Sequence, residues 1–161
     1  MTAARLRTAF ILASAAWLVL LFAVPMLAGR AHASALGSAL IVGVYGIGSL
    51  VCHQLPERSY QVWGAQMPVC ARCAGIYVGA VLGALGARAF QTSASGRSAE
   101  GLALHRSRIL LALAVTPTLV TLAYEWTTGD MPSHAIRAAA GLPIGLAVAW
   151  LVVAATDNQV N

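Results

Sequence analysis

The sequence predicts an all-α integral membrane protein, a bundle of about five transmembrane helices. Apolar residues make up 59% of the 161 positions and charged residues only 9%, whereas soluble domains are roughly half apolar and a quarter charged. The apolar residues are also grouped into runs, most of them close to the length of about 20 residues that a helix needs to cross the hydrocarbon core. Because backbone polar groups in lipid must be satisfied within their own segment, helices are the expected form of these runs.

Five apolar runs are the expected helices, and the second is the shortest. They are residues 9–28, 36–51, 69–90, 109–126 and 135–155. Arg5 and Arg7 before the first run, and the small-residue pattern Ala31-His32-Ala33 after it, are features of a cleaved signal peptide. We expect an uncleaved helix, because this run exceeds the roughly 7 to 15 apolar residues of a signal peptide. Cleavage would leave four helices.

One helical domain, residues 1–161, accounts for the whole chain. The stretch "QTSASGRSAEG" resembles a flexible linker and predicts a mobile loop near residues 91–107. The positive charge comes from ten arginines near the ends of the apolar runs. No segment resembles a water-facing basic domain, so nucleic acid is not an expected partner. The expected partner is the lipid bilayer, and the expected location is the bacterial inner membrane as a multi-pass protein.

Glycines recur at four-residue intervals in the third and fifth expected helices, which places them on one side of each helix. Such faces allow close backbone packing in membranes. The two helices could pack on each other or on Gly43 and Gly46 of the second helix; formation of a homo-oligomer is an equal alternative. The residues concerned are Gly75, Gly79 and Gly83 in the third helix and Gly141 and Gly145 in the fifth.

All three cysteines lie at two neighbouring helix ends. Cys52 and His53 end the second expected helix, while Cys70 and Cys73 fall in the first turn of the third, with Tyr77 on the same face and Arg72 on the glycine side. A Cys3His set suits four-coordinate Zn(II), and a C-x2-C pair separated from further ligands by a loop is a common zinc arrangement. In regular backbone, the side chains of the adjacent residues Cys52 and His53 point in different directions. Both can therefore bind one metal ion only if the chain bends at this point. The alternative is that the cysteines are only small apolar side chains.

The segment also resembles a known family. The runs Cys52-His53-Gln54-x-Pro56-Glu57-Arg58-Ser59 and Pro68-Val69-Cys70-Ala71-Arg72-Cys73-Ala74-Gly75-Ile76-Tyr77-x-Gly79 resemble the signature of a family of small bacterial and archaeal membrane proteins with a domain of unknown function. The resemblance extends to Arg137 and Gly141, whereas Thr121 stands at the family's Asp position and Glu125 at its Gln position. It implies that the cysteine region is one functional unit and implies no activity.

Other polar residues of the spans are candidates for supporting roles. Glu125 is an ionisable residue in an apolar helix and therefore a candidate catalytic base; the alternative is an interfacial ion pair with Arg137. Arg58 is expected to pair with Glu57 in water. Arg72 lies between the two cysteines in sequence and could hold their thiolate charge or an anionic headgroup.

Three functions follow from these features. The first is a metal site formed by Cys52, His53, Cys70 and Cys73, with Zn(II) favoured over iron. The second is a membrane thiol–disulfide oxidoreductase that uses the Cys70–Cys73 pair with Cys52 as a third thiol. The third and weakest is a subunit of a small-solute or ion transporter, suggested by Pro117, Thr121 and Glu125 on one helix face. These features do not decide whether the protein is an enzyme.

Overall fold

The computed structural model describes residues 3–30, 34–91 and 100–158 and confirms the all-α fold. Its five α-helices are α1 (Ala3–Ala28), α2 (Ala35–Val51), α3 (Ala71–Gln91), α4 (Glu100–Thr128) and α5 (His134–Asn158). Three of them contain segments long and apolar enough to cross a membrane, namely Ala4–Ala28, His105–Thr128 and His134–Thr156. The apolar segments Ala35–Val51 of α2 and Ala71–Ala87 of α3 are shorter.

The helix bounds follow the apolar runs, with two clear differences. Helix α1 begins at Ala3, six residues before the first apolar run. Helix α4 begins at Glu100, so residues 100–107 continue the helix, whereas the polar composition had suggested that the loop extends to 107. Residues 92–99, the rest of the expected mobile loop, lie outside the described residues.

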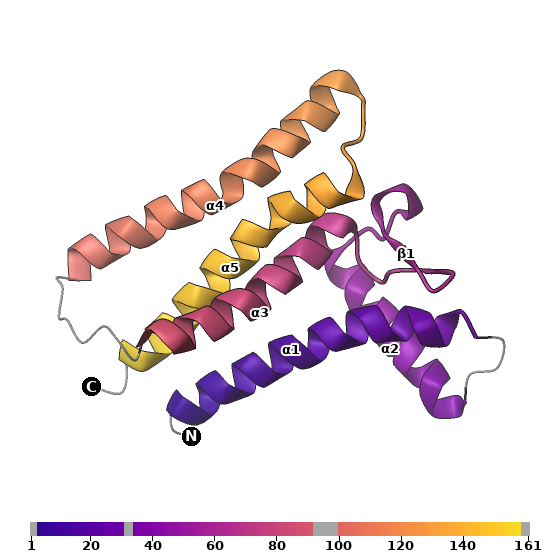
Figure 1. Ribbon diagram of the computed structural model, residues 1–161, viewed down its shortest axis with the longest axis horizontal. Coiled ribbons are helices and arrows are strands. Elements are labelled where there is room, and N and C mark those ends of the chain that lie inside the picture. The colour runs from indigo at the N-terminus through magenta and orange to yellow at the C-terminus, as the bar shows by residue number, and fades with distance from the viewer. Residues whose placement is uncertain (1–2, 31–33, 92–99, 159–161) are drawn as a thin grey trace.

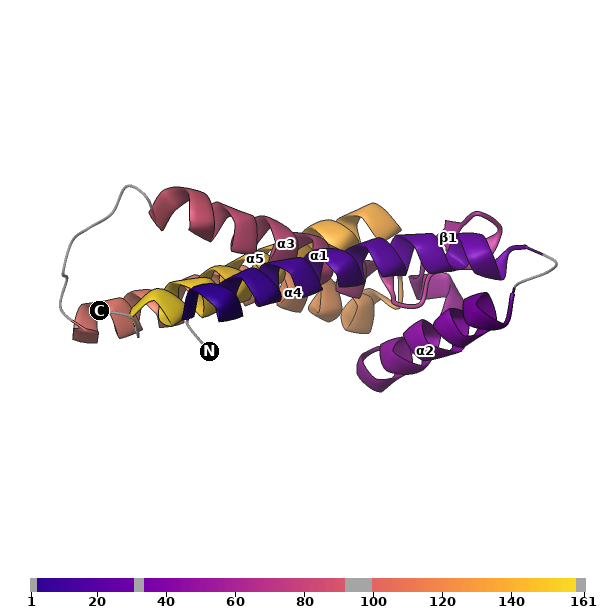
Figure 2. The ribbon, with the colours of Figure 1, turned by 90° about the horizontal axis from the view of Figure 1, so that it is seen from below.

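The long helices α1, α3, α4 and α5 run roughly along one direction, and α2 diverges from them at one end (Figures 1 and 2). The C-terminal ends of α1 and α4 and the N-terminal ends of α3 and α5 meet at that end (Figure 1). Helices α3 and α5 form the most extensive pair. Helix α4 packs on α5, and the buried Thr118 hydroxyl of α4 donates a 2.7 Å hydrogen bond to the Ala140 carbonyl.

The glycine faces explain how closely α3 and α5 pack. A Cβ added at Gly75 would meet the Ala138 backbone, and one added at Gly145 would meet the Ile76 carbonyl. An added Cβ would meet backbone atoms of the facing helix at every glycine of the set, namely Gly75, Gly79, Gly83, Gly141 and Gly145. The glycine faces of α3 and α5 therefore pack against each other within the chain. The glycine packing does not extend to α2, because in the part of the chain that the structure describes nothing lies within 4 Å of a Cβ added at Gly43 or Gly46.

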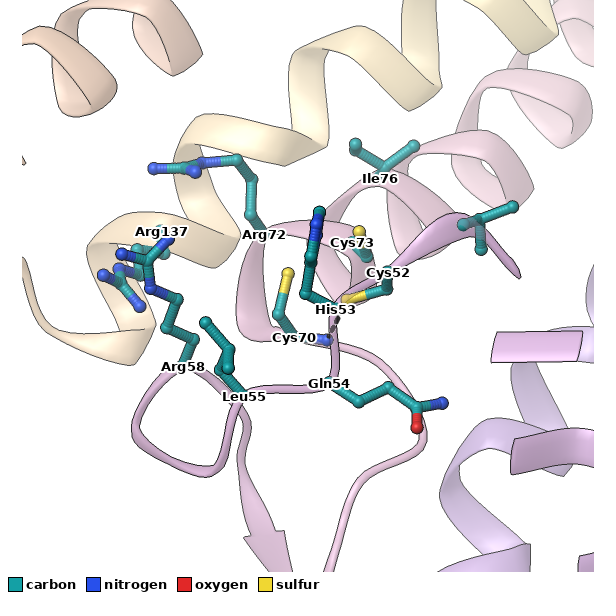
Figure 3. Close-up of a pocket in the computed structure, with 11 residues that line it drawn as sticks. Cys52, His53, Gln54, Leu55, Arg58, Cys70, Arg72, Cys73, Ile76 and Arg137 are labelled. Carbon is teal, nitrogen blue, oxygen red and sulfur yellow. Dashed lines mark hydrogen bonds between the residues drawn. The ribbon is translucent and has the colours of Figure 1, made fainter. Parts of the chain in front are cut away.

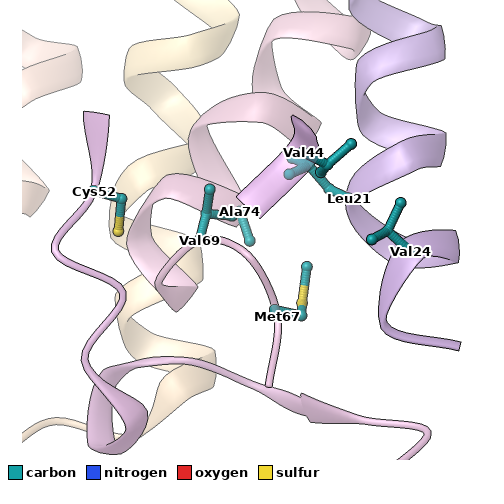
Figure 4. Close-up of a cluster of buried hydrophobic side chains, with 7 residues drawn as sticks. All are labelled: Leu21, Val24, Val44, Cys52, Met67, Val69 and Ala74. Atoms are coloured by element: carbon teal, nitrogen blue, oxygen red, sulfur yellow. The ribbon is translucent and has the colours of Figure 1, made fainter. Parts of the chain in front are cut away.

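A small hydrophobic cluster anchors the segment between α2 and α3. Met67 and Val69 of that segment are fully buried against α1, α2 and α3 (Figure 4). The cluster consists of Leu21, Val24, Val44, Cys52, Met67, Val69 and Ala74. Burial of such side chains contributes about 1.5–3 kcal/mol each. The cluster thereby fixes the chain on both sides of the cysteines.

The same segment contains elements that apolar patterning did not predict. A 3-10 turn, η1 (Pro56–Arg58), is followed by the antiparallel hairpin of β1 (Gln61–Val62) and β2 (Ala65–Gln66). Trp63 and Gly64 form its two-residue turn with φ of +57° and +77°. Positive φ at both central positions is typical of the tight turns that join hairpin strands.

Candidate metal centre

The three cysteines converge from two helix ends. Cys52 follows α2 in extended conformation, Cys70 directly precedes α3, and Cys73 lies in the first turn of α3. Their sulfur atoms all lie within 4.8 Å of one another. The Cys70 backbone N–H donates to the Cys52 sulfur at 3.1 Å (Figure 3). Cys52 is buried and the other two are half-buried, and all three are free thiols. The expected grouping of the cysteines is thus present, and the group could bind a metal.

Gln54, which was not among the expected site residues, connects the segment after α2 to the segment before α3 by hydrogen bonds. Its side-chain amide donates to the Tyr45 carbonyl at 2.8 Å and to the Pro68 carbonyl at 2.7 Å. Its backbone has φ of +49°, which is uncommon for a residue other than glycine. Gly48 permits this approach, because a Cβ there would lie 2.8 Å from the Gln54 Nε2 atom. The only sequence signal was its place beside Cys52 and His53.

His53 is not part of the sulfur group. Its neighbour Cys52 has φ of −146° and ψ of 136°, and side chains alternate in direction along extended backbone. The exposed His53 side chain lines the cavity next to the cysteines (Figure 3). The structure therefore matches the case in which only one member of the Cys-His pair joins the cluster.

The close contact of the sulfurs changes the chemistry of Cys70. A side-chain hydrogen bond from Cys73 lowers the pKa of Cys70 to about 5, although burial opposes the shift, and backbone and Cys52 hydrogen bonds assist it. A lowered thiol pKa at the start of a helix is typical of cysteines that act as nucleophiles or metal ligands. Cys70 is therefore a thiolate at neutral pH.

A second cluster, which we call the arginine cluster, surrounds Glu125 beside the cysteines. The Arg72 Nη2 group donates to Glu125 Oε1 at 2.9 Å and to Thr121 at 3.1 Å. Arg137 Nε lies 3.2 Å from Glu125 Oε1, and Arg58 Nη2 lies 3.8 Å from Glu125 Oε2. Arg137 is 2% exposed and Glu125 is 8% exposed.

This geometry gives each of these residues a specific contact. The ion pair expected between Glu125 and Arg137 is present, but it is buried. Arg58 reaches across to Glu125, and Arg72 binds Glu125 and Thr121 on α4. Tyr77 lies on the cysteine side of α3, where its ring packs edge-on against Trp17 with the centroids 6.2 Å apart. Both carboxylate oxygens of Glu125 face guanidinium groups, which is the ion-pair arrangement that the sequence offered as an alternative.

One cavity of about 320 Å³ connects the two clusters (Figure 3). Its wall contains all three cysteines and all three arginines, together with His53, Gln54, and the apolar Val51, Leu55 and Ile76. A ligand in this cavity would contact thiols and guanidinium groups at once.

Comparisons with known proteins agree with the membrane fold. Residues 52–151 match the model of a family described as "Predicted membrane protein (DUF2085)". An uncharacterised protein of Methanocaldococcus jannaschii is 40% identical over 63 residues, which are 39% of this chain and 40% of that protein. An uncharacterised protein of Methanothermobacter thermautotrophicus is 33% identical over 101 residues, 63% of this chain and 83% of that protein. The chain thus spans about two fifths of the first relative's length. No solved structure matches.

Proposed function

The chain belongs to this family of membrane proteins, and we propose that it holds one Zn(II) ion in the cell membrane through Cys52, Cys70 and Cys73. The observation that carries the proposal is the convergence of the three sulfurs within 4.8 Å. Zn–S bonds of about 2.3 Å in a tetrahedron place sulfurs about 3.8 Å apart. The cluster needs only a small contraction to reach that spacing.

Three protein ligands leave the fourth position of a tetrahedral site open. Such sites are typical of catalytic zinc, which binds water or substrate there and lowers the pKa of the water. The cavity touches all three cysteines, so a small molecule can reach this position. His53, also on the cavity wall, is the protein group that could instead close the site.

Metal analysis of protein purified in detergent tests the proposal. We expect close to one zinc per chain in the wild type and less than about a tenth of that in Cys52→Ser, Cys70→Ser and Cys73→Ser. His53→Ala should keep most of the metal and lose at most about 10–100-fold in affinity, the range of effects that outer groups have on metal sites. His105→Ala, an exposed histidine on α4, is the matched control. Absence of metal from the wild type, or zinc that persists in the cysteine variants, would refute the proposal.

The lowered pKa of Cys70 favours a second candidate, thiol–disulfide exchange. In that reaction the Cys70 thiolate attacks a substrate disulfide and releases one substrate thiolate. The Cys73 thiol then gives its proton to the first released substrate thiolate and attacks the Cys70 sulfur of the mixed disulfide, which releases the second substrate thiolate and leaves a Cys70–Cys73 disulfide. The cavity beside both residues gives a substrate access.

The pH dependence of alkylation tests the state of Cys70. Because its pKa is lowered to about 5, metal-free protein should keep its thiolate above that value and lose it as the pH falls through 5. An ordinary thiol with a pKa of about 8.5 has lost most of its thiolate by pH 7. Iodoacetamide labelling followed by mass spectrometry should show fast modification of Cys70 at pH 6. Cys73→Ala removes the hydrogen-bond donor and should move the profile upward. A Cys70 profile that falls near pH 8 would contradict this assignment.

A further inference from the structure

We propose that the cavity beside the cysteines is a phosphate-binding site formed by Arg58, Arg72 and Arg137. The proposal goes beyond the metal centre and does not depend on it. The first observation is charge: three guanidinium groups face a single carboxylate, Glu125. Buried charge without a partner is costly, on the order of several kcal/mol per ion. An anion that enters the cavity would offset this excess.

The second observation is unused hydrogen-bonding capacity. Among the described residues, the Nε groups of Arg58 and Arg72 and the Nη2 group of Arg137 are buried and have no hydrogen-bond partner, while Arg137 Nε faces Glu125 Oε1 at 3.2 Å only as an ion pair. Buried donors are nearly always paired in folded proteins, so such groups point to a missing ligand or water. Arg137, whose side chain is 3% exposed, lines the cavity.

Hydrogen-bonding geometry favours phosphate. Three arginines, Glu125 and the Cys70 thiolate on the same cavity wall leave a formal excess of one positive charge. A phosphate monoester carries about −1.5 to −2 at pH 7 and offers several acceptor oxygens. Arginine is also the side chain whose planar fork matches phosphate with two parallel hydrogen bonds.

Two sources can supply this group, namely free phosphate from water and the headgroup of an anionic phospholipid. The cavity wall also carries the apolar residues Val51, Leu55 and Ile76. Trp63 and Trp126, at 66% and 82% exposed, lie in the hairpin segment and beside Glu125. Exposed tryptophans are typical of the membrane–water interface, where headgroups lie. Free phosphate and a lipid headgroup can therefore both reach the cavity.

Equilibrium dialysis with radiolabelled inorganic phosphate tests the site on the full chain in a phosphate-free detergent. We expect saturable binding by the wild type, weakened about tenfold or more in Arg58→Gln, because a charge-assisted hydrogen bond is lost. Arg58 has a side chain that is 38% exposed, so this variant should fold. Arg58→Lys keeps the charge without the planar fork and should give an intermediate loss. Arg108→Gln, an exposed arginine 17 positions from Glu125 along α4 and thus about 25 Å away, should bind within twofold of the wild type.

Reconstitution identifies the source. The protein is placed in phosphatidylcholine nanodiscs with or without phosphatidylglycerol. Equal phosphate affinity in both discs supports free phosphate as the ligand. Weaker phosphate binding in the phosphatidylglycerol discs, with more phosphatidylglycerol retained by the wild type than by Arg58→Gln in native mass spectrometry, supports a headgroup. Absence of saturable phosphate binding in detergent, or phosphate binding that Arg58→Gln leaves unchanged, overturns the proposal. Wild-type protein freed of metal by a chelator should still bind phosphate, which separates this outcome from failure of the metal centre.

Discussion

Gly145→Ala is expected to lower the free energy of unfolding by at least about 3 kcal/mol. A Cβ at this position would overlap the Ile76 carbonyl and lie 2.7 Å from the Ala80 nitrogen. Overpacking usually costs about 1–3 kcal/mol when side chains can move aside. Here the obstacle is the backbone of α3, so the two helices must separate. The gain in helix propensity, about 1 kcal/mol for Gly to Ala, is too small to compensate.

Gly46→Ala is the matched control. It makes the same exchange within α2, where nothing lies within 4 Å of the new Cβ. Its expected effect is neutral to slightly stabilising, by up to about 1 kcal/mol. Equilibrium unfolding in mixed micelles, followed by circular dichroism, measures both variants. A Gly145→Ala protein as stable as Gly46→Ala would mean that α3 and α5 do not pack along their glycines.

Glu125→Gln is expected to destabilise the protein by about 3–5 kcal/mol, the range for breaking a buried ion pair by removal of one partner. The substitution keeps the size of the side chain and removes the carboxylate that Arg72, Arg137 and Arg58 share. Three buried or half-buried guanidinium groups would then face one another without a counter-charge. Because these residues belong to α3, α4, α5 and the segment after α2, the loss should affect the whole helix assembly.

A double-mutant cycle separates the energy of the Glu125–Arg137 ion pair from the effect of changing each side chain. Arg137→Gln alone should also destabilise, whereas Glu125→Gln with Arg137→Gln should cost less than the two single changes added together. Removing both partners takes away an unfavourable isolated charge. The same unfolding assay measures all three variants. Additivity within about 0.5 kcal/mol would contradict a direct interaction between the two residues.

Most of the helical architecture could be predicted from the sequence, because hydropathy indicates which segments can form helices in lipid. The cysteine grouping was also predictable, since Cys52 ends one helix and Cys70 and Cys73 begin the next, with one connection between them. The role of His53 could not be predicted, because it is adjacent to Cys52. Since the backbone at Cys52 is extended, the two side chains point in different directions, and only Cys52 joins the sulfur group.

The arginine cluster was not predictable in the same way. Its members lie far apart in the chain, from Arg58 to Arg137, and meet only because the glycine faces set the register of α3 against α5. From the sequence, Arg58 was expected to pair with Glu57, an ion pair with Arg137 was one alternative for Glu125, and Arg72 was assigned to the thiolates or an anionic headgroup. The buried contacts instead gather three cations around Glu125. The hairpin was missed for another reason, since its two-residue strands are too short to show a periodic pattern.

X-ray absorption spectroscopy at the zinc edge tests the central claim most directly, with the protein purified in detergent and never exposed to chelators. The claim is that one ion is bound by the sulfurs of Cys52, Cys70 and Cys73. The predicted spectrum shows three sulfur neighbours at about 2.3 Å and one lighter atom at about 2.0–2.2 Å. Cys73→Ser protein that still binds zinc should show fewer sulfurs. A zinc ion surrounded only by nitrogen and oxygen, or protein without bound metal, would contradict the account.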